Sequence, residues 1–227
     1  MNRETYQAIE AYMLSAMADS AHDPQHIYRV LYAALDIAGT EEGVDRDILV
    51  AACLLHDVGR ADQARDPAVC HAEAGSEKAY AFLRGLGWPE ARAAWVRSCV
   101  LTHRYRDDRR PESLEAKILF DADKLDVCGA IGIARTLFYG GQISQPLYRL
   151  GEDGSVLTAP DSPPSFFREY NYKLRGIEAG MYTRRAKELA ADRRETADGY
   201  YDALLSEVRG CAEAGRKGLE DFLQSEK

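Results

Sequence analysis

The amino-acid sequence predicts an all-α fold, for three reasons. Apolar residues recur at intervals of three and four positions through most of the chain, which is the period of an amphipathic helix. Strand-like segments are scarce: only residues 142–159, with the turn-like Glu152-Asp153-Gly154, are compatible with one small β-hairpin. The 227 residues are 46% hydrophobic and 29% charged, which is enough apolar material to bury a sizeable core.

The helices of the first part of the chain follow from this periodicity. Asp23-Pro24 is a cap followed by proline at the first helical position. The apolar face that follows ends at Gly39 and consists of Ile27, Val30, Leu31, Ala34, Leu35 and Ala38. A similar pattern runs from Val44 to Leu55 and stops near Gly59. Further helices are expected at about residues 71–84, 89–103, 112–127 and 130–139.

From about residue 162 the pattern changes to long amphipathic helices among many charges. One apolar stripe consists of Phe166, Tyr170, Leu174, Ile177 and Met181, and a later one of Ala197, Tyr200, Leu204, Val208 and Cys211. Such helices either cover the first part of the chain or meet a second copy of it, as in a homodimer. The predicted organisation is a single domain over residues 1–227, with its core at about 20–140 and a helical extension at about 162–215.

Composition and charge exclude several classes of protein. No apolar run approaches the roughly 18 residues of a membrane span, and Met1-Asn2-Arg3-Glu4 does not open a secretory signal peptide. A net charge of −8 argues against binding to polymeric nucleic acid, although a local basic patch can still hold small anions. The five cysteines form no C-x-x-C pair, which indicates reduced, structural thiols. These features predict a cytoplasmic protein without membrane contact.

Histidines and aspartates on apolar helix faces are the candidate functional residues. All five histidines fall within the first 103 residues: His22, His26, His56, His71 and His103. His56 closes an apolar run and is followed directly by Asp57. Three carboxylates, Asp121, Asp123 and Asp126, interrupt a helix that is apolar on nearly all sides. Because buried carboxylates must be paired or coordinated, these residues point to a mixed nitrogen and oxygen metal site.

Each residue taken alone has a simpler interpretation. A single histidine on an apolar face is most often a hydrogen-bonded core residue, and His22 is interpreted as a residue at a helix start. The three aspartates could cap a helix or pair with Lys117, Lys124 and Arg135. The ordered set of residues is what favours a metal site over these separate roles.

That ordered set resembles the HD-domain metal-dependent phosphohydrolases. The resemblance rests on His26, on His56-Asp57 at the end of Ala51-Ala52-Cys53-Leu54-Leu55, and on the distant Asp123. It is closest to a branch of small, single-domain bacterial HD proteins, through the run DADKLDVCGAIGIAR at residues 121–135, Phe138-Tyr139-Gly140-Gly141 and Pro146-Leu147-Tyr148. It covers roughly residues 5–210, and it implies a helical bundle of the HD type.

The resemblance implies roles for particular residues. The implied metal ligands are His26, His56, Asp57 and Asp123, with Asp123 preferred to Asp121 because the matching motif reads Ala-Asp-basic-Leu. His71 and His103 match positions that hold a second metal or contact phosphate. Asp57 is the expected bridge between two metals, and Asp57, Lys124 and Asp126 are the candidate catalytic residues. The cations expected to bind substrate phosphates are Arg29, Arg60, Lys78, Arg104 and Arg135.

The expected cofactor is a divalent cation. Imidazole and carboxylate ligands suit manganese best, with iron, nickel, zinc and cobalt as alternatives, and magnesium alone is a poorer match. A cation at such a site activates water for attack on phosphorus. Proteins of the resembling branch act on nucleotides, so the expected reaction is cleavage of a nucleoside triphosphate to monophosphate and pyrophosphate.

Three other functions stay open. The first is a phosphomonoesterase or nucleotidase that releases orthophosphate. The second is a nucleotide-binding sensor without turnover, and the third is a helical protein that only oligomerises through residues 162–215. Hydrolysis of guanosine tetraphosphate is disfavoured because Val58-Gly59-Arg60-Ala61 stands where those enzymes carry a Glu-Asp pair. The Gly-Tyr-Pro signature of HD-type cyclic-dinucleotide phosphodiesterases is also missing.

Overall fold

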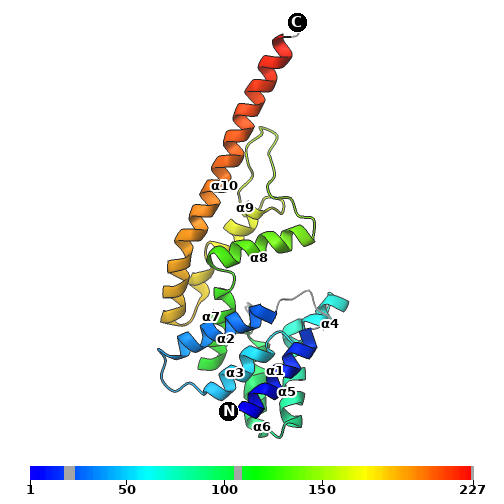
Figure 1. Cartoon of the computed structure of the whole chain (residues 1–227), viewed down its shortest axis with the longest axis vertical. Helices are drawn as coiled ribbons and strands as arrows, with labels where there is room; N and C mark the ends of the chain where they lie inside the picture. Colours follow the sequence, from blue (N-terminus) through cyan, green and yellow to red (C-terminus); the bar gives the residue numbers. More distant parts are fainter. Residues whose placement is uncertain (18–23, 105–108, 226–227) are drawn as a thin grey trace. The chain divides into compact units, whose positions relative to one another are not determined.

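A computed structural model describes residues 1–17, 24–104 and 109–225 of the chain. The described residues are predominantly helical and group into two compact units (Figure 1). Unit one comprises Met1–Asp126 and Met181–Glu188, and unit two comprises Val127–Gly180 and the chain from Leu189 onward. The prediction of an all-α protein is confirmed, because the described part of the chain forms helices and no β-strand beyond one isolated bridge.

The described residues of unit one form seven helices before the chain enters unit two. They are α1 (Arg3–Met17), α2 (Pro24–Ala38), α3 (Arg46–Leu55), α4 (Arg60–Arg65), α5 (His71–Gly85), α6 (Glu90–Leu101) and α7 (Leu114–Leu125). The first residues of α10 (Arg184–Ser225) also belong to this unit. Five of these helices match the ranges that periodicity predicts, whereas α1 and α4 do not appear in that prediction. The cap expected at Asp23 lies outside the described residues.

Helix α3 is the centre of unit one. Its residues from Ile48 to Leu55 are apolar without interruption, so the helix has no face suited to water. It accordingly packs against α1, α2, α6 and α7, and almost every residue in that run is buried. Asp45 caps its start by accepting hydrogen bonds from the amides of Asp47 and Ile48, at 3.1 Å each. The helix therefore delivers its last residues into the interior of the unit.

The turn after α3 lies directly against α5. A Cβ atom placed on Gly59 would stand 2.2 Å from the carbonyl oxygen of His71 and 2.5 Å from the amide nitrogen of Gly75. Only a residue without a side chain permits this approach of two backbones. The contact brings the His56-Asp57 end of α3 beside the start of α5, where His71 lies.

Unit two has an aromatic core of its own. It contains α8 (Gly129–Gln142), α9 (Phe166–Glu169), a π-helical turn η1 (Tyr170–Leu174), a 3₁₀ turn η2 (Ile177–Gly180) and most of α10. Its buried cluster consists of Ile133, Val156, Phe166, Phe167, Tyr170, Ala197 and Tyr201. The rings of Tyr170 and Tyr201 lie 4.8 Å apart, a separation typical of favourable aromatic pairs.

Two details of unit two differ from the sequence prediction. The β-hairpin considered for residues 142–159 is reduced to one isolated bridge between Leu150 and Val156 in the described chain. The apolar stripe from Phe166 to Met181 does not lie on one long helix. The chain there is divided into the short helix α9, the π-helical turn η1 and the 3₁₀ turn η2. Phe166, Phe167 and Tyr170 all turn toward the aromatic core, and Gly176 follows η1 as a residue of low helix propensity. The later stripe does lie on one long helix, α10.

All five cysteines are free thiols. Burial raises the pKa of Cys99 to about 12 and that of Cys128 to about 11. Within the described ranges, each helix is either too short or too polar to cross a lipid bilayer.

Candidate metal centre

Six predicted residues of unit one converge on one place from five parts of the chain. His26 lies on α2, His56 and Asp57 at the end of α3, His71 at the start of α5, His103 just after α6, and Asp123 on α7. The four histidines and Asp57 are buried, each with an exposed fraction of 3% or less. So many ionisable groups are rarely buried together without partners or a bound cation.

The six residues form two groups. The first group is His26, His56 and Asp123, whose ligand atoms all lie within 4.8 Å of one another. His26 Nε2 lies 3.3 Å from His56 Nε2 and 3.4 Å from Asp123 Oδ1. These atoms are a mixed set of imidazole and carboxylate donors, which suits a transition-metal dication.

The second group is Asp57, His71 and His103, which meet the same 4.8 Å limit. His71 Nε2 lies 3.3 Å from His103 Nε2 and 3.5 Å from Asp57 Oδ1. His103 Nε2 lies 3.6 Å from the same Asp57 oxygen. The second group thus also combines two imidazole nitrogens with a carboxylate, and both histidines face the same oxygen, Asp57 Oδ1.

Asp57 stands between the two groups. Its Oδ2 lies 3.6 Å from Nε2 of both His26 and His56, while its Oδ1 faces His71 and His103. Oδ2 is buried and has no hydrogen-bond partner among the described residues. A buried carboxylate oxygen without a partner is costly, and a cation in the first group would satisfy it. The sequence analysis expected a bridging position for this residue.

The Nδ1 atoms of the first group fix which ring nitrogens can bind a cation. His26 Nδ1 donates to Asp126 Oδ2 at 2.7 Å, and His56 Nδ1 donates to the backbone oxygen of Cys53 at 2.7 Å. An ionised carboxylate and a backbone carbonyl can only accept. A neutral imidazole that donates through Nδ1 carries a lone pair on Nε2, so the Nε2 atoms of His26 and His56, 3.3 Å apart, both act as acceptors and cannot hydrogen-bond to each other. This donor set fits a divalent cation.

Burial and charge shift the pKa values of the cluster. Burial lowers the pKa of His56 to about 4, against the opposing charge of Asp57. Burial also lowers the pKa of His71 to about 2, and the positive charge of Arg60 acts in the same direction. Burial alone would raise the pKa of Asp57, but the charges of His56 and Arg60 outweigh it and hold that pKa well below its usual range. His56 and His71 are thus held neutral and Asp57 ionised, as metal ligands need to be.

Three further predicted residues, Asp126, Arg60 and Lys124, contact the cluster directly, and Arg29 contacts it through Asp126. Arg29 donates to Asp126 from Nε at 2.6 Å and from Nη2 at 3.0 Å, while Asp126 in turn holds His26. Arg60 Nε donates to Asp57 Oδ1 at 2.8 Å. Lys124 Nζ donates to Asp123 Oδ2 at 2.7 Å. Each carboxylate of the cluster region therefore has a cation beside it.

Of the remaining predicted cations, Arg104 directly follows His103, and its charge acts on His71. Arg104 Nη1 is 3.6 Å from the sulfur of Cys70, the residue before His71. Lys78 pairs with Asp62. Arg135 lies on α8 in unit two. His22, which the sequence analysis leaves out of the site, falls outside the described residues.

Asp121, the alternative to Asp123, forms hydrogen bonds with residues directly before α10 instead of facing the histidines. It is fully buried and accepts hydrogen bonds from the amides of Tyr182 and Thr183 and from the Thr183 hydroxyl, the last at 2.7 Å. Burial raises its pKa, and these hydrogen bonds oppose that rise. The structure therefore brings Asp123, and not Asp121, to the histidines.

Sequence reasoning missed the groups that orient the second pair of rings. His71 Nδ1 lies 2.6 Å from Gln63 Oε1 on α4, and His103 Nδ1 donates to the backbone oxygen of Val100 at 2.6 Å. Backbone acceptors carry no sequence signal. Gln63 lies on a six-residue helix without buried residues, so no apolar period marks it.

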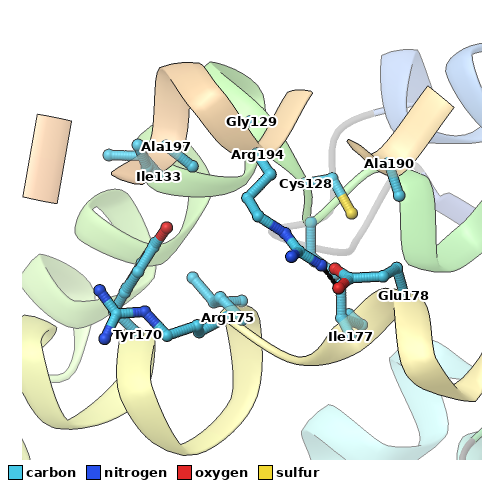
Figure 2. Close-up of a pocket in the computed structure, with 12 residues that line it drawn as sticks. Cys128, Gly129, Ile133, Tyr170, Arg175, Ile177, Glu178, Ala190, Arg194 and Ala197 are labelled. Atoms are coloured by element: carbon cyan, nitrogen blue, oxygen red, sulfur yellow. Dashed lines mark ion pairs between the residues drawn. The ribbon is translucent and has the colours of Figure 1, made fainter. Parts of the chain in front are cut away.

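Unit two contains a pocket lined by parts of α8, η1, η2 and α10 (Figure 2). Inside it Arg194 pairs with Glu178, and the guanidinium of Arg175 lies 4.9 Å from the Tyr201 ring. The described residues that line this pocket include no histidine and none of the predicted site residues. The candidate metal ligands therefore all come from unit one.

Comparisons with known proteins agree with this arrangement. The family model of the HD domain matches residues 25–128, a range that contains both groups. The protein YpgQ of Bacillus subtilis (strain 168) is 30% identical over 196 residues, which are 82% of this chain and 85% of YpgQ. A crystal structure of YpgQ in complex with ADP has a TM-score of 0.70 at 28% identity and covers 90% of this chain and 98% of that one.

Two other solved structures are similar along most of their length. A protein from Lactobacillus plantarum has a TM-score of 0.72 at 25% identity, covering 92% of this chain and 99% of its own. An HD-superfamily hydrolase from Bacillus thuringiensis has a TM-score of 0.69 at 27% identity, covering 90% and 97%. The similarity therefore extends over the whole fold and is not confined to the histidine cluster.

Proposed function

The chain belongs to the HD-domain phosphohydrolase superfamily, and on that premise we propose that it hydrolyses phosphate bonds of nucleotides with a divalent cation. The proposed reaction converts a nucleoside triphosphate to the monophosphate and pyrophosphate. Manganese is the proposed cation, and the cytoplasm the proposed location.

The observation that carries this proposal is the donor set of the first group. The Nε2 atoms of His26 and His56 lie 3.3 Å apart, beside Asp123 and beside an Oδ2 atom of Asp57 that has no hydrogen-bond partner among the described residues. In the proposal His26, His56, Asp57 and Asp123 hold the cation. A divalent cation supplies Lewis-acid polarisation of a phosphoryl oxygen and makes water a better nucleophile.

The surrounding residues orient the ligands. Asp126 fixes the ring of His26 through Nδ1, and Arg29 fixes Asp126. Such outer hydrogen bonds set the tautomer and direction of a ligating histidine. We therefore assign Asp126 a positioning role, in place of the direct catalytic role that the sequence analysis expected.

Cations beside the cluster are the proposed contacts for substrate phosphates. The side chains of Arg29 and Arg60 are 32% and 27% exposed, so a ligand can reach them from solvent. The side chain of Lys124, which pairs with Asp123, is 17% exposed. Guanidinium groups bind phosphate oxygens through charge-assisted hydrogen bonds. A nucleotide substrate is further supported by the ADP complex of YpgQ.

Product analysis tests the reaction. Purified protein is stripped of metal, restored with Mn²⁺ and offered a panel of nucleoside triphosphates, and the products are resolved by phosphorus NMR. Pyrophosphate plus monophosphate is the expected result. Orthophosphate alone would replace the proposal with a phosphomonoesterase, and metal binding without turnover would replace it with a nucleotide sensor.

Two variants connect turnover to the cluster. His56→Ala and the isosteric Asp123→Asn are expected to lose Mn²⁺ binding and activity while circular dichroism stays helical. His22→Ala, a histidine that is assigned to no site, is the matched control and should retain both properties. A fully active His56→Ala protein would refute the assignment of the first group.

A further inference from the structure

The two groups differ in whether the oxygen of Asp57 that faces them already has a hydrogen-bond partner. In the first group, Oδ2 of Asp57 has no hydrogen-bond partner in the described structure, and the Nε2 atoms of His26 and His56 cannot donate to each other. In the second group, the corresponding oxygen of Asp57, Oδ1, already accepts from Arg60 Nε at 2.8 Å. The Asp57 oxygen that faces the second group is thus already paired with a cation of the chain, whereas the Asp57 oxygen that faces the first group is not.

The tautomer of His71 is also less constrained than those of the first group. Its Nδ1 faces the side-chain amide of Gln63 at 2.6 Å. An amide can present either its oxygen or its NH₂ group. When it presents the NH₂ group, His71 carries its proton on Nε2 and donates to His103 Nε2, 3.3 Å away. His103 can accept because its own Nδ1 donates to the backbone oxygen of Val100.

The placement of the chain's own cations favours a cation in the first group over one in the second. The carboxylates that face the groups are Asp123 and Asp57, since Asp126 contacts His26 and Arg29 on the outer side. Lys124 pairs with Asp123 through Oδ2, which leaves the Oδ1 atom that faces His26, whereas Arg60 pairs with Asp57 through Oδ1, the atom that faces His71 and His103. A second dication would have only the Oδ1 atom that Arg60 already occupies, close to the charge of that guanidinium. Like charges at such range repel strongly away from bulk water.

We propose that Arg60 is a built-in counter-cation that keeps the His71, His103 and Asp57 group free of metal, so that the resting protein binds one divalent ion per chain. The proposal rests on the proposed metal site of the first group. It assigns Arg60 a role in metal stoichiometry, in addition to any contact with phosphate.

Metal counting tests the proposal in the absence of substrate. The metal-stripped full-length protein is titrated with Co²⁺ and, separately, with Mn²⁺, and bound metal is measured by elemental analysis after desalting. The wild-type chain should retain one equivalent. Arg60→Gln removes the charge at nearly constant length and should bind a second equivalent about tenfold or more tighter than the wild type does.

Matched variants make the result specific. Arg60→Lys keeps the positive charge and should stay at one equivalent. Arg65→Gln makes the same change on the same helix at an exposed residue that pairs with Asp62, and should also stay at one. In the Arg60→Gln background, His71→Ala should remove the second equivalent and leave the first. Manganese EPR adds a direct readout, because two neighbouring ions give a coupled spectrum and one ion does not.

The outcomes separate this proposal from the proposed function. A wild-type protein with two tight equivalents and a coupled EPR spectrum would overturn the role of Arg60 but leave the phosphohydrolase intact. A folded Arg60→Gln protein that still binds one equivalent would overturn it as well. A wild-type protein that binds no metal would refute the proposed function itself.

Discussion

Asp126→Asn is the sharpest test of how the cluster is organised, because this residue contacts the proposed ligand His26 without belonging to either group. Its carboxylate accepts hydrogen bonds from His26 Nδ1 at 2.7 Å, from Arg29 Nε at 2.6 Å and from Arg29 Nη2 at 3.0 Å. An asparagine offers one accepting oxygen, so its NH₂ group must face either the His26 N–H or an Arg29 N–H. At least one charge-assisted hydrogen bond is therefore lost.

The expected magnitude follows from two independent figures. A hydrogen bond to a charged group contributes about 1.5–3 kcal/mol. Removing an outer partner of a metal-binding histidine weakens metal binding by roughly 10–100-fold, which corresponds to about 1.4–2.8 kcal/mol. Because the two ranges overlap, we expect the Kd for Mn²⁺ to rise by roughly 10–100-fold in the Asp126→Asn variant, with a folded protein.

Isothermal titration of Mn²⁺ into metal-stripped protein measures this change. Asp36→Asn is the matched control, because Asp36 also accepts from an arginine, Arg185, at 3.0 Å but is exposed and belongs to neither group. Its Kd should stay within about twofold of the wild type. Equal affinities for the wild type and Asp126→Asn, or an equal loss in Asp36→Asn, would refute the reasoning that the Asp126 contact orients His26.

Three further predictions concern stability. Gly59→Ala should lower the free energy of unfolding by at least about 1–3 kcal/mol in urea denaturation, because its Cβ would meet backbone atoms at 2.2 and 2.5 Å. The metal-free protein should lose about 2 kcal/mol between pH 7 and pH 5 through His56: its pKa is lowered by burial to about 4 in the folded state and is about 6.5 when unfolded, so below pH 6.5 the unfolded chain binds the extra proton. Thr183→Val should cost about 1–2 kcal/mol, because Asp121 loses a buried donor and the Ala186 amide loses its acceptor.

Each of these predictions has its own control. Gly85→Ala, where an added Cβ meets no atom within 4 Å, should not destabilise the protein. A metal-free protein that is equally stable at pH 7 and pH 5 would contradict the burial of a neutral His56. Thr183→Ser retains the hydroxyl and should recover most of the loss, so a Ser variant as unstable as the Val variant would argue against the hydrogen bonds.

The sequence was sufficient to predict the burial of a site residue wherever that burial follows from the apolar pattern of a single helix. The uninterrupted apolar run at the end of α3 predicts that His56 and Asp57 emerge into the interior, and the structure places them there. The same local argument applies to His26 on α2 and to Asp123 on α7. The convergence of all six was expected from the ordered set together with its resemblance to the HD-domain phosphohydrolases, and the structure brings them together.

The features that sequence reasoning missed depend on contacts between distant residues. Asp121 accepts a hydrogen bond from the amide of Thr183, which is 62 residues away in the sequence. Gln63 contacts His71 because the turn at Gly59 packs against α5. The break of the stripe between Phe166 and Met181 has the same origin. There the helical period competes with aromatic packing of Phe166 and Tyr170 against residues of α10, and tertiary packing wins over local periodicity.

The burial of α3 also has a kinetic consequence. The amides of a fully buried helix exchange with solvent only when most of the unit opens, so their protection approaches the global free energy of unfolding. His56 and Asp57 directly follow this helix and share its surroundings. We therefore expect no partial opening that frees these two residues while the rest of unit one stays closed. Deuterium uptake along α3 and the dismantling of the cluster should then follow one common rate.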